Sequence, residues 1–437
     1  MINIISIILG KAVIFLSNTL KIGSGSTWPG HIALKLNPNF IKDILRSHLP
    51  GGKLKIIIIA GTNGKTTTGR LVTSVIRENN KTYLQNKAGA NLINGLASAI
   101  IKGASILSLA RRDPDRLNQD YLIFESDENA LSEVLQQTNP DYVIVLNLFR
   151  DQLDRYGEVN TIAKKWQEAF ANLSLKTKLI LNADDPLIAY LSKKTKAKAV
   201  FFGLSEKSHN KLEHGADTLF CPECNSKLEF SSVFFSHLGI WNCPNCNLKR
   251  PKVSLSKLDK YPLVGTYSKY NSLAAALFAK EEKISQINVQ KAFKTFTPAF
   301  GRQEEINYKG KNVQLFLSKN PTSFNESLST VNELGGKNIL LVLNDRIPDG
   351  LDVSWIWDIN FSDYLGKDIN IGVAGDRVYD MGLRLKYEEQ FSHVFSKLEE
   401  AVYKMVYNLD KNETLFILPN YSAMLEVRKI LTGKKIL

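Results

Sequence analysis

The segment GTNGKTTT, Gly61 to Thr68, has the residue types and spacing needed to hold phosphate groups. Its glycines let backbone N–H groups close around phosphate oxygens, Lys65 can reach the β- and γ-phosphates, and the Thr66 hydroxyl can bind Mg²⁺. Ile59 stands where the longer GxxxxGK[ST] pattern has its first glycine. A plain strand-to-helix turn is the alternative. We predict ATP binding by Gly61, Thr62, Asn63, Gly64, Lys65, Thr66 and Thr67.

An acidic residue follows the next apolar run of the sequence. Glu125, in LIFESDE, ends a run whose type predicts a buried strand. A carboxylate there would be a hard oxygen ligand for a Mg²⁺ ion that bridges phosphates. Asp127 and Glu128 are weaker candidates by the same argument, and a solvated acidic loop is the alternative. We therefore predict a magnesium site at Thr66 and Glu125.

The four cysteines form two C-x2-C pairs separated by eighteen residues. This spacing is typical of a structural zinc ribbon, in which four thiolates close the coordination shell and leave no open position for chemistry. A thiol redox pair is the alternative. The pattern also favours a reducing compartment, so we expect a cytoplasmic protein. The predicted zinc ligands are Cys221, Cys224, Cys243 and Cys246.

Strands and helices must alternate to position these residues. The apolar runs DYLIFESDE, DYVIVLNLF and TKLILNADDP are separated by helical patterns such as ALSEVLQQT, which predicts a parallel sheet covered on both faces. In such sheets ligands bind at the carboxyl ends of the strands. A second, smaller alternation follows TPAFGRQEE. We predict an N-terminal helical segment over 1–48, an ATP-binding domain over 49–300 with the zinc ribbon inserted at 215–252, and a C-terminal α/β domain over 301–437.

The 437-residue chain has a formal net charge of +13, with its basic residues spread along the sequence. A basic surface attracts phosphates of every kind, and a solvated surface is the alternative. The apolar first twenty residues contain Lys11, have no charged region before them and no small-residue cleavage site after them. They therefore resemble neither a signal peptide nor a membrane span. We expect a helix that packs on the protein or touches the inner face of the membrane.

Four segments together, AGTNGKTTT, NLFRDQLDRYGE, LNADDP and YNSLAAA, resemble the Mur ligase family. These ATP-dependent enzymes activate a carboxylate as an acyl phosphate and then add an amine. The cysteine insertion and NDRIPDGLDVSWIWD resemble the amidating branch of this family, whose members form a heterodimer with a GatD-like class I glutaminase subunit. The resemblance implies ATP, Mg²⁺ and structural Zn²⁺. It also implies that ammonia from glutamine converts the α-carboxyl of D-glutamate in the lipid II stem peptide to D-isoglutamine, a step of peptidoglycan biosynthesis.

The resemblance assigns further residues. Asn271 in KYNSLAAA and Arg302 in FGRQEE match residues near ATP, and Asp352 matches a catalytic aspartate that acts across the interface on the glutaminase Cys and His. The chain departs from the family pattern at Ser268, Arg346 and Pro348.

The other residues around Asp352 receive more ordinary interpretations. We expect the other three aspartates of this segment to accept backbone N–H groups within its turns, and the two tryptophans to pack or to contact a partner. These aspartates are Asp345, Asp349 and Asp358.

Two other classes of function stay open. One is a stand-alone Mur or folylpolyglutamate synthetase-like ligase that adds an amino acid. The "DQ" at Asp151 and Gln152, where such Mur ligases have "DH", counts against it. The other is a zinc-containing nucleic-acid-binding ATPase, but the sequence has no basic stripe rich in aromatic residues. We therefore expect no nucleic-acid partner.

Overall fold

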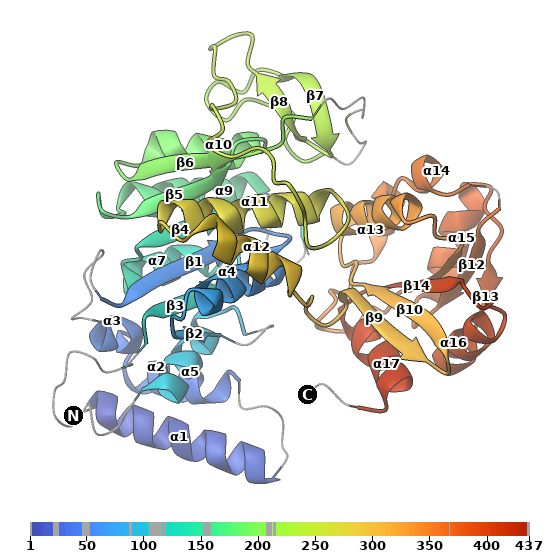
Figure 1. Cartoon of the computed structure of the whole chain (residues 1–437), viewed down its shortest axis with the longest axis horizontal. Helices are drawn as coiled ribbons and strands as arrows, with labels where there is room; N and C mark the ends of the chain where they lie inside the picture. The colour runs from blue at the N-terminus through green and yellow to red at the C-terminus, as the bar shows by residue number, and fades with distance from the viewer. Residues whose placement is uncertain are drawn as a thin grey trace.

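The computed structural model describes residues 2–20, 26–45, 53–86, 90–104, 117, 119–151, 159–206, 212, 216–366 and 368–434. Figure 1 shows a larger sheet region with helices α1 to α3 at one end and a β-hairpin at the other, and a second sheet region beside it. Within these ranges no helix is both long and apolar enough to cross a bilayer.

The first sheet has six parallel strands in the order β2-β3-β1-β4-β5-β6. Side chains alternate between its faces, so Ile56 and Ile58 of the central strand join one buried cluster and Ile57 and Ile59 the other. The strands are β1 (Lys55–Ala60), β2 (Tyr83–Gln85), β3 (Tyr121–Glu125), β4 (Tyr142–Val145), β5 (Lys178–Asn182) and β6 (Lys198–Phe202).

Helices cover both faces of this sheet, as the near-continuous apolar strands require. One face is covered by α5 (Ile93–Gly103), α7 (Leu131–Thr138), α9 (Val159–Ala171) and α10 (Pro186–Leu191), which continues into the short η1 (Ser192–Lys194). The other is covered by α4 (Lys65–Glu78), α11 (Thr266–Glu281) and α12 (Gln286–Lys294). Beyond α5 lie α1 (Ile2–Leu20), α2 (Trp28–Leu36) and α3 (Phe40–Ile44).

The cysteine-bearing insertion carries the antiparallel hairpin of β7 (Glu229–Phe235) and β8 (Leu238–Asn242). Buried polar contacts fix it to the end of β5. The Trp241 indole N–H donates to the Ala183 carbonyl oxygen at 3.1 Å, and Arg250 pairs with Asp184 at 2.5 Å. The Asp184 carboxylate also accepts from the Tyr270 hydroxyl at 2.7 Å, so it joins the insertion to α11.

The second sheet has the order β13-β12-β11-β14-β10-β9 and is parallel except for the β9–β10 pair. Its strands are β9 (Arg302–Tyr308), β10 (Lys311–Phe316), β11 (Asn338–Val342), β12 (Asn370–Ala374), β13 (His393–Val394) and β14 (Thr414–Pro419). Its helices are α13 (Pro321–Glu333), η2 (Ser354–Asp358), α14 (Phe361–Tyr364), α15 (Val378–Tyr387), α16 (Leu398–Tyr407) and α17 (Tyr421–Thr432). The first four pack on one face, and α16 and α17 pack on the other.

The predicted fold class is confirmed: two α/β regions, of which the first has a wholly parallel sheet and carries a cysteine insertion. The strands β2, β6, β9 and β13 were not predicted. All four are edge strands or short strands. The residues of β9 are mostly charged or polar and are half-exposed or exposed, so they do not form an apolar run. The division of the chain at 48/49 and 300/301 stays a prediction.

Candidate functional site

The loop between β1 and α4 needs glycine at two positions, because its backbone is crowded by neighbouring groups and has positive φ angles there. Gly61 and Gly64 have φ of +135° and +90°, which an L side chain rarely adopts. A Cβ on Gly64 would lie 2.1 Å from Asn271 Oδ1. The Asn271 side chain also accepts from the Thr68 hydroxyl at 3.2 Å, so the helix α11 braces the start of α4.

The side chain of Asn147, two residues after the end of β4, holds the loop in place. Asn147 Oδ1 accepts from the Asn63 backbone N–H at 2.9 Å, and Asn147 Nδ2 donates to the Asn63 carbonyl oxygen at 3.1 Å. The Lys65 amino group donates to the Gly61 carbonyl oxygen at 2.5 Å and to Glu128 Oε2 at 3.3 Å. The amino group of Lys65 therefore lies between the backbone of the glycine loop and the carboxylate of Glu128.

Glu125 lies directly beside Thr66. The Thr66 hydroxyl donates to Glu125 Oε2 at 2.7 Å, and Gln85 Nε2 donates to Glu125 Oε1 at 3.1 Å. Burial raises the pKa of Glu125, against the opposing effects of the Thr66 hydrogen bond and of the charges on Arg302 and Lys65. A hydroxyl and a buried carboxylate in contact are a donor set that suits Mg²⁺, so these two residues fit the ion predicted for them.

A second group of charges lies next to this pair and includes a residue that the sequence did not single out. Lys319, just before α13, forms an ion pair with Asp151. Burial and the Glu128 charge raise the pKa of Asp127. Burial alone would raise the pKa of Glu128, but Lys65 and Lys319 outweigh it and lower that pKa.

Two buried carboxylate oxygens of this group have no hydrogen-bond partner within the described part of the chain: Glu128 Oε1 and Asp151 Oδ1. Buried acceptors of this kind are costly unless a ligand or ion satisfies them. Lys319 and Asn320 follow an apolar run of the second sheet, so the rule that ligands bind at the carboxyl ends of strands could have found them.

The two sheet regions meet at this site. Asn320 Nδ2 donates to Asn63 Oδ1 at 3.4 Å, and Arg150 pairs with Asp358 at 3.3 Å. Arg302, at the start of β9, is half-buried and its charge acts on Glu125. The structure therefore brings the predicted ATP residues Asn271 and Arg302 to the same edge as the glycine loop.

A pocket of about 150 Å³ opens between these regions. It is lined by Arg150 and Asp151, by 319–321 and by side chains from 349–358, including Asp352. Asp352 is exposed, and its carboxylate accepts the Ser354 backbone N–H at 2.8 Å. That hydrogen bond lowers its pKa, so the group is ionised at neutral pH. Asp352 lies outside the acidic group that surrounds Lys65, but one pocket links it to Lys319.

The expectation that the other aspartates of this segment bond its own turns holds in part for Asp349, whose carboxylate accepts the Arg346 backbone N–H. For Asp345 and Asp358 the contacts are different. Asp345 pairs with Arg377 at 3.2 Å, and Asp358 pairs with Arg150. Asp349 accepts the Ser422 backbone N–H, at the start of α17, at 2.9 Å. The partners Arg377, Arg150 and Ser422 are distant in sequence, so local turn chemistry cannot reveal them.

The tryptophans of this segment differ in burial. Trp355 is partly buried, with its ring 6.1 Å from that of Phe324, and Trp357 is 49% exposed. The sequence analysis gave two possible roles for these tryptophans, packing or contact with a partner. The position of Trp355 fits packing.

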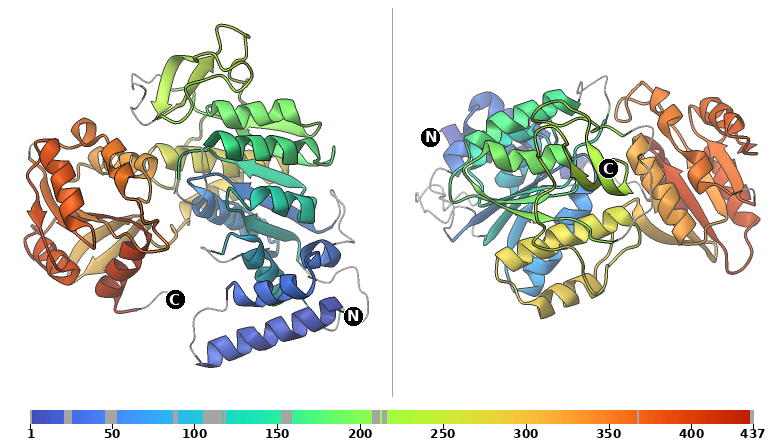
Figure 2. Two further views of the ribbon diagram at one scale, coloured as in Figure 1. Left: turned by 180° about the vertical axis from the view of Figure 1, so that it is seen from behind. Right: turned by 90° about the horizontal axis from the view of Figure 1, so that it is seen from above.

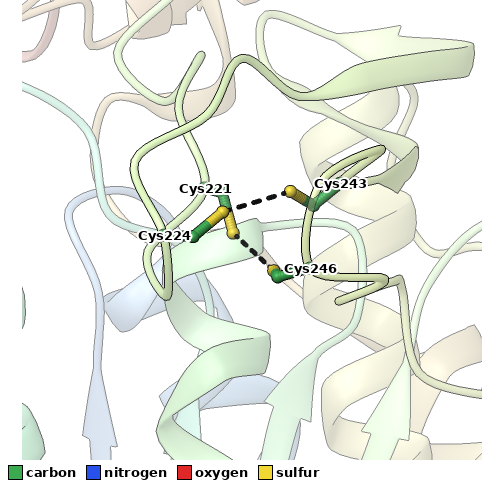
Figure 3. Close-up of side chains that lie close together, drawn as sticks. All are labelled: Cys221, Cys224, Cys243 and Cys246. Atoms are coloured by element: carbon green, nitrogen blue, oxygen red, sulfur yellow. Dashed lines mark hydrogen bonds between the residues drawn. The ribbon is translucent and has the colours of Figure 1, made fainter.

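The four cysteine side chains converge at the base of the hairpin (Figure 3). All four sulfur atoms lie within 4.8 Å of one another. Each C-x2-C turn is followed by an asparagine with positive φ, +60° at Asn225 and +57° at Asn247, a conformation that asparagine tolerates. Four thiols at this separation fit one tetrahedral zinc ion, whose ligating sulfurs lie roughly 3.8 Å apart.

Comparison with known proteins agrees with this geometry. The Mur ligase middle domain matches residues 59–279, and the MurT ligase C-terminal domain matches residues 317–424. The "Lipid II isoglutaminyl synthase (glutamine-hydrolyzing) subunit MurT" of Staphylococcus aureus is 30% identical over 92% of this chain and 91% of its own length. The chain belongs to the MurT branch of the Mur ligase family. The protein of the same name from Streptococcus pneumoniae is 29% identical over 95% of this chain and 94% of its own length.

The fold is also similar to that of a more distant ligase of known structure. The structure of a pseudomurein peptide ligase type C from Methanothermus fervidus has a TM-score of 0.67 at 23% identity and covers 90% of this chain and 81% of its own. Mur ligases are ATP-dependent carbon–nitrogen ligases that use Mg²⁺. In this MurT-branch chain, the glycine loop and its carboxylates lie in the Mur ligase middle domain, whereas Lys319 and Asp352 lie in the MurT C-terminal domain.

Proposed function

We propose that this chain is the ligase subunit of a glutamine-dependent enzyme that amidates the α-carboxyl of D-glutamate in lipid II to D-isoglutamine. The observation that carries the proposal is that three features of the site lie next to one another. The phosphate-binding loop, the Lys319–Asp151 pair and the Asp352 pocket adjoin one another at the meeting of the two sheet regions. The names of the relatives, which join lipid II, glutamine hydrolysis and a subunit, support the same reaction.

The chemistry is a two-step transfer. The substrate carboxylate attacks the γ-phosphorus of ATP, which gives an acyl phosphate and ADP. Ammonia then attacks the acyl carbon, the C–O bond to phosphate breaks, and inorganic phosphate leaves with the electron pair while the nitrogen loses a proton. Lys65 and Arg302 would balance negative charge on the phosphates, and Lys319, whose charge acts on Glu128 as that of Lys65 does, adds a third cation to the site.

The bound groups follow from the donor sets. ATP would be held by Gly61 to Thr67, Asn271 and Arg302. Mg²⁺ would be held by Thr66 and Glu125, where it supplies charge neutralisation at the phosphates. Zn²⁺ would be held by the four cysteines in a closed, structural site.

A class I glutaminase of the GatD type is the proposed partner in a heterodimer. Asp352 is ionised and exposed, as a carboxylate that orients a histidine on a second chain must be. Ile347 and Leu351 beside it are 80% and 67% exposed. Exposed apolar residues next to a charged one are typical of a protein interface.

The pocket at Asp352 provides a passage for ammonia from the partner. Its lining carries both charges, with Asp151 paired to Lys319 and Asp358 paired to Arg150, so it offers polar walls to neutral ammonia. Lys319 links the pocket to the acidic group around Lys65, because both lysines act on Glu128. The whole site would function in the cytoplasm, where ATP and the lipid II stem peptide are accessible.

Reconstitution tests the proposal. The purified chain with ATP, Mg²⁺, lipid II and glutamine should form no isoglutamine, and adding the glutaminase subunit should start amide formation, followed by mass spectrometry of the muropeptides. Ammonium at high pH should replace both glutamine and partner, because the acyl phosphate needs only an amine. An isolated chain that hydrolyses glutamine, or ammonium that gives no amide, would contradict the proposal.

A further inference from the structure

The first helix of the chain has its apolar side chains on the outside. Residues that recur on one face of α1 are exposed, and all but one of them are apolar: Ile2, Ile5, Ile8, Leu9, Ala12, Phe15, Leu16, Thr19 and Leu20. Phe15 and Leu20 are 70% and 61% exposed. A helix at a water-exposed surface normally has the opposite arrangement, so this stripe requires a partner.

Several polar side chains of α1 lie on the side of the helix that faces the protein. Asn3 contacts Asp43 at 3.4 Å, the buried Ser6 hydroxyl donates to the Ile2 carbonyl oxygen at 3.0 Å, and Lys11 reaches the Lys102 carbonyl oxygen at 3.4 Å. The docked face of α1 is mixed, because Ile7 is fully buried in the core and Ile4 and Ile14 pack against it. The helix is docked through this face on α2 and α5, which leaves the apolar stripe on the outside. Figures 1 and 2 show α1 at the outer edge of the molecule, away from the second sheet.

Charge at this end of the molecule favours an anionic surface. Residues 1–46 contain five lysines and arginines and one acidic residue, Asp43. Lys35, Lys42 and Lys102 are exposed. Trp28, at the start of α2, is 67% exposed. Tryptophan and lysine beside an apolar helix face are the composition of helices that lie in the headgroup region of a bilayer.

The helix α1 does not qualify as a membrane-spanning helix. Its 19 residues span about 28 Å, but Lys11 interrupts the apolar run, and within the described residues no helix qualifies as a span. A helix that is docked on the protein by one face and exposes an apolar face opposite can contact a bilayer by lying parallel to the membrane plane.

We infer that the exposed face of α1 binds the surface of an anionic bilayer and holds the enzyme against the membrane that contains its lipid-linked substrate. The choice of a bilayer over a second copy of the chain rests on the proposed function and on the basic charge of this end. In this arrangement α1 lies flat in the headgroup layer, and the cleft between the sheets stays on the aqueous side.

Vesicle binding by the full chain tests the inference. Vesicles of equal parts phosphatidylglycerol and phosphatidylcholine are sedimented with the wild type, with the double variant Phe15→Glu/Leu16→Glu, and with Leu175→Glu. Leu175 is 69% exposed but lies far from α1 in the sequence, in the loop after α9, which makes it a matched control. We expect the double variant to lose at least about tenfold in partition coefficient, since two large apolar side chains leave the bilayer, and Leu175→Glu to match the wild type.

A second readout is independent of the folding of the double variant. Brominated lipid should quench tryptophan fluorescence of the wild type, and Trp28→Phe should lose most of that quenching.

Three outcomes would overturn the inference: no vesicle binding by the wild type, equal binding by the double variant, or a wild-type dimer that Phe15→Glu/Leu16→Glu dissociates without any vesicle binding. Failure of the proposed function is distinguishable, because a chain that binds vesicles but amidates no lipid II keeps this inference and loses that function.

Discussion

At the scale of single residues, the contact between Thr66 and Glu125 is the centre of the predicted magnesium site. Glu125→Gln keeps the shape of the side chain and its contact with Thr66 but removes the charge. We expect amidation to fall by roughly one to two orders of magnitude, because a neutral amide is a poorer ligand for Mg²⁺. Steady-state rates at varied Mg²⁺ measure this effect. Glu133→Gln, at an exposed position of α7, is the control.

The same variant makes a prediction about stability. Burial raises the pKa of Glu125, so the folded chain holds this proton more tightly than the unfolded chain does. The free energy of unfolding therefore falls as pH rises through the interval between the two pKa values, which begins at about pH 4. The Glu125→Gln variant has no carboxyl group to titrate, so its free energy of unfolding does not fall for this reason. Its stability relative to the wild type should therefore increase from acid toward neutral pH, as measured by urea unfolding. A variant that becomes relatively less stable over that range would contradict this account.

Residue types at fixed spacing were sufficient to predict the glycine loop and the cysteine set, because each depends on local sequence. Lys319 was missed because its importance comes from a partner, Asp151, that is 168 residues away in the chain. The ion pairs of Asp345 and Asp358 were missed for the same reason. Gln152, which supported the amidating branch, lies outside the described residues.

At the scale of elements, the hairpin insertion depends on its four thiols and on its anchors to β5. We expect about one zinc per chain by elemental analysis, and loss of the metal in Cys224→Ser, since three thiolates bind zinc far more weakly than four. Proteolysis should then cut within 221–246, while ATP binding stays because the glycine loop belongs to another element. Ser231→Ala, on an exposed part of β7, is the control. A wild type without metal would contradict the zinc assignment.

The pocket between the two sheet regions makes a separate prediction. Ser354→Phe should narrow it, because the Ser354 side chain lines it. In the assembled complex, glutamine-driven amidation should fall severalfold, ammonium-driven amidation should stay near wild type, and glutamate release should exceed amide formation. Ser354→Ala should behave as wild type. An equal fall of both reactions would show that the pocket does not carry ammonia.

The parallel strands of the first sheet were predictable because a strand buried on both faces is a continuous apolar run. The edge strand β9 was not, since one of its sides lacks a neighbour and its sequence is charged. The position of the pocket also required the structure, because it depends on Arg150–Asp358 and Asn63–Asn320 contacts between segments that local patterns treat separately.

At the scale of the whole molecule, the two sheet regions divide the work. The first holds the predicted phosphate-binding loop, and the second supplies Lys319, whose charge acts on Glu128 beside Lys65, and the exposed Asp352. The segment around Asp352 contains no histidine or cysteine, so an aspartate of the triad type requires a second chain. This arrangement separates ATP use from glutamine hydrolysis, which makes the two activities independently testable.

The most direct measurement compares two nitrogen sources in the complex of the Asp352→Asn chain with its glutaminase subunit. Glutamine-driven amidation should fall by roughly three to four orders of magnitude, as expected when a neutral side chain replaces the carboxylate that orients a catalytic histidine, while ammonium-driven amidation stays within about twofold. Asp363→Asn, an exposed aspartate of α14, should leave both rates unchanged. Equal loss of the two reactions, or none, would contradict the account.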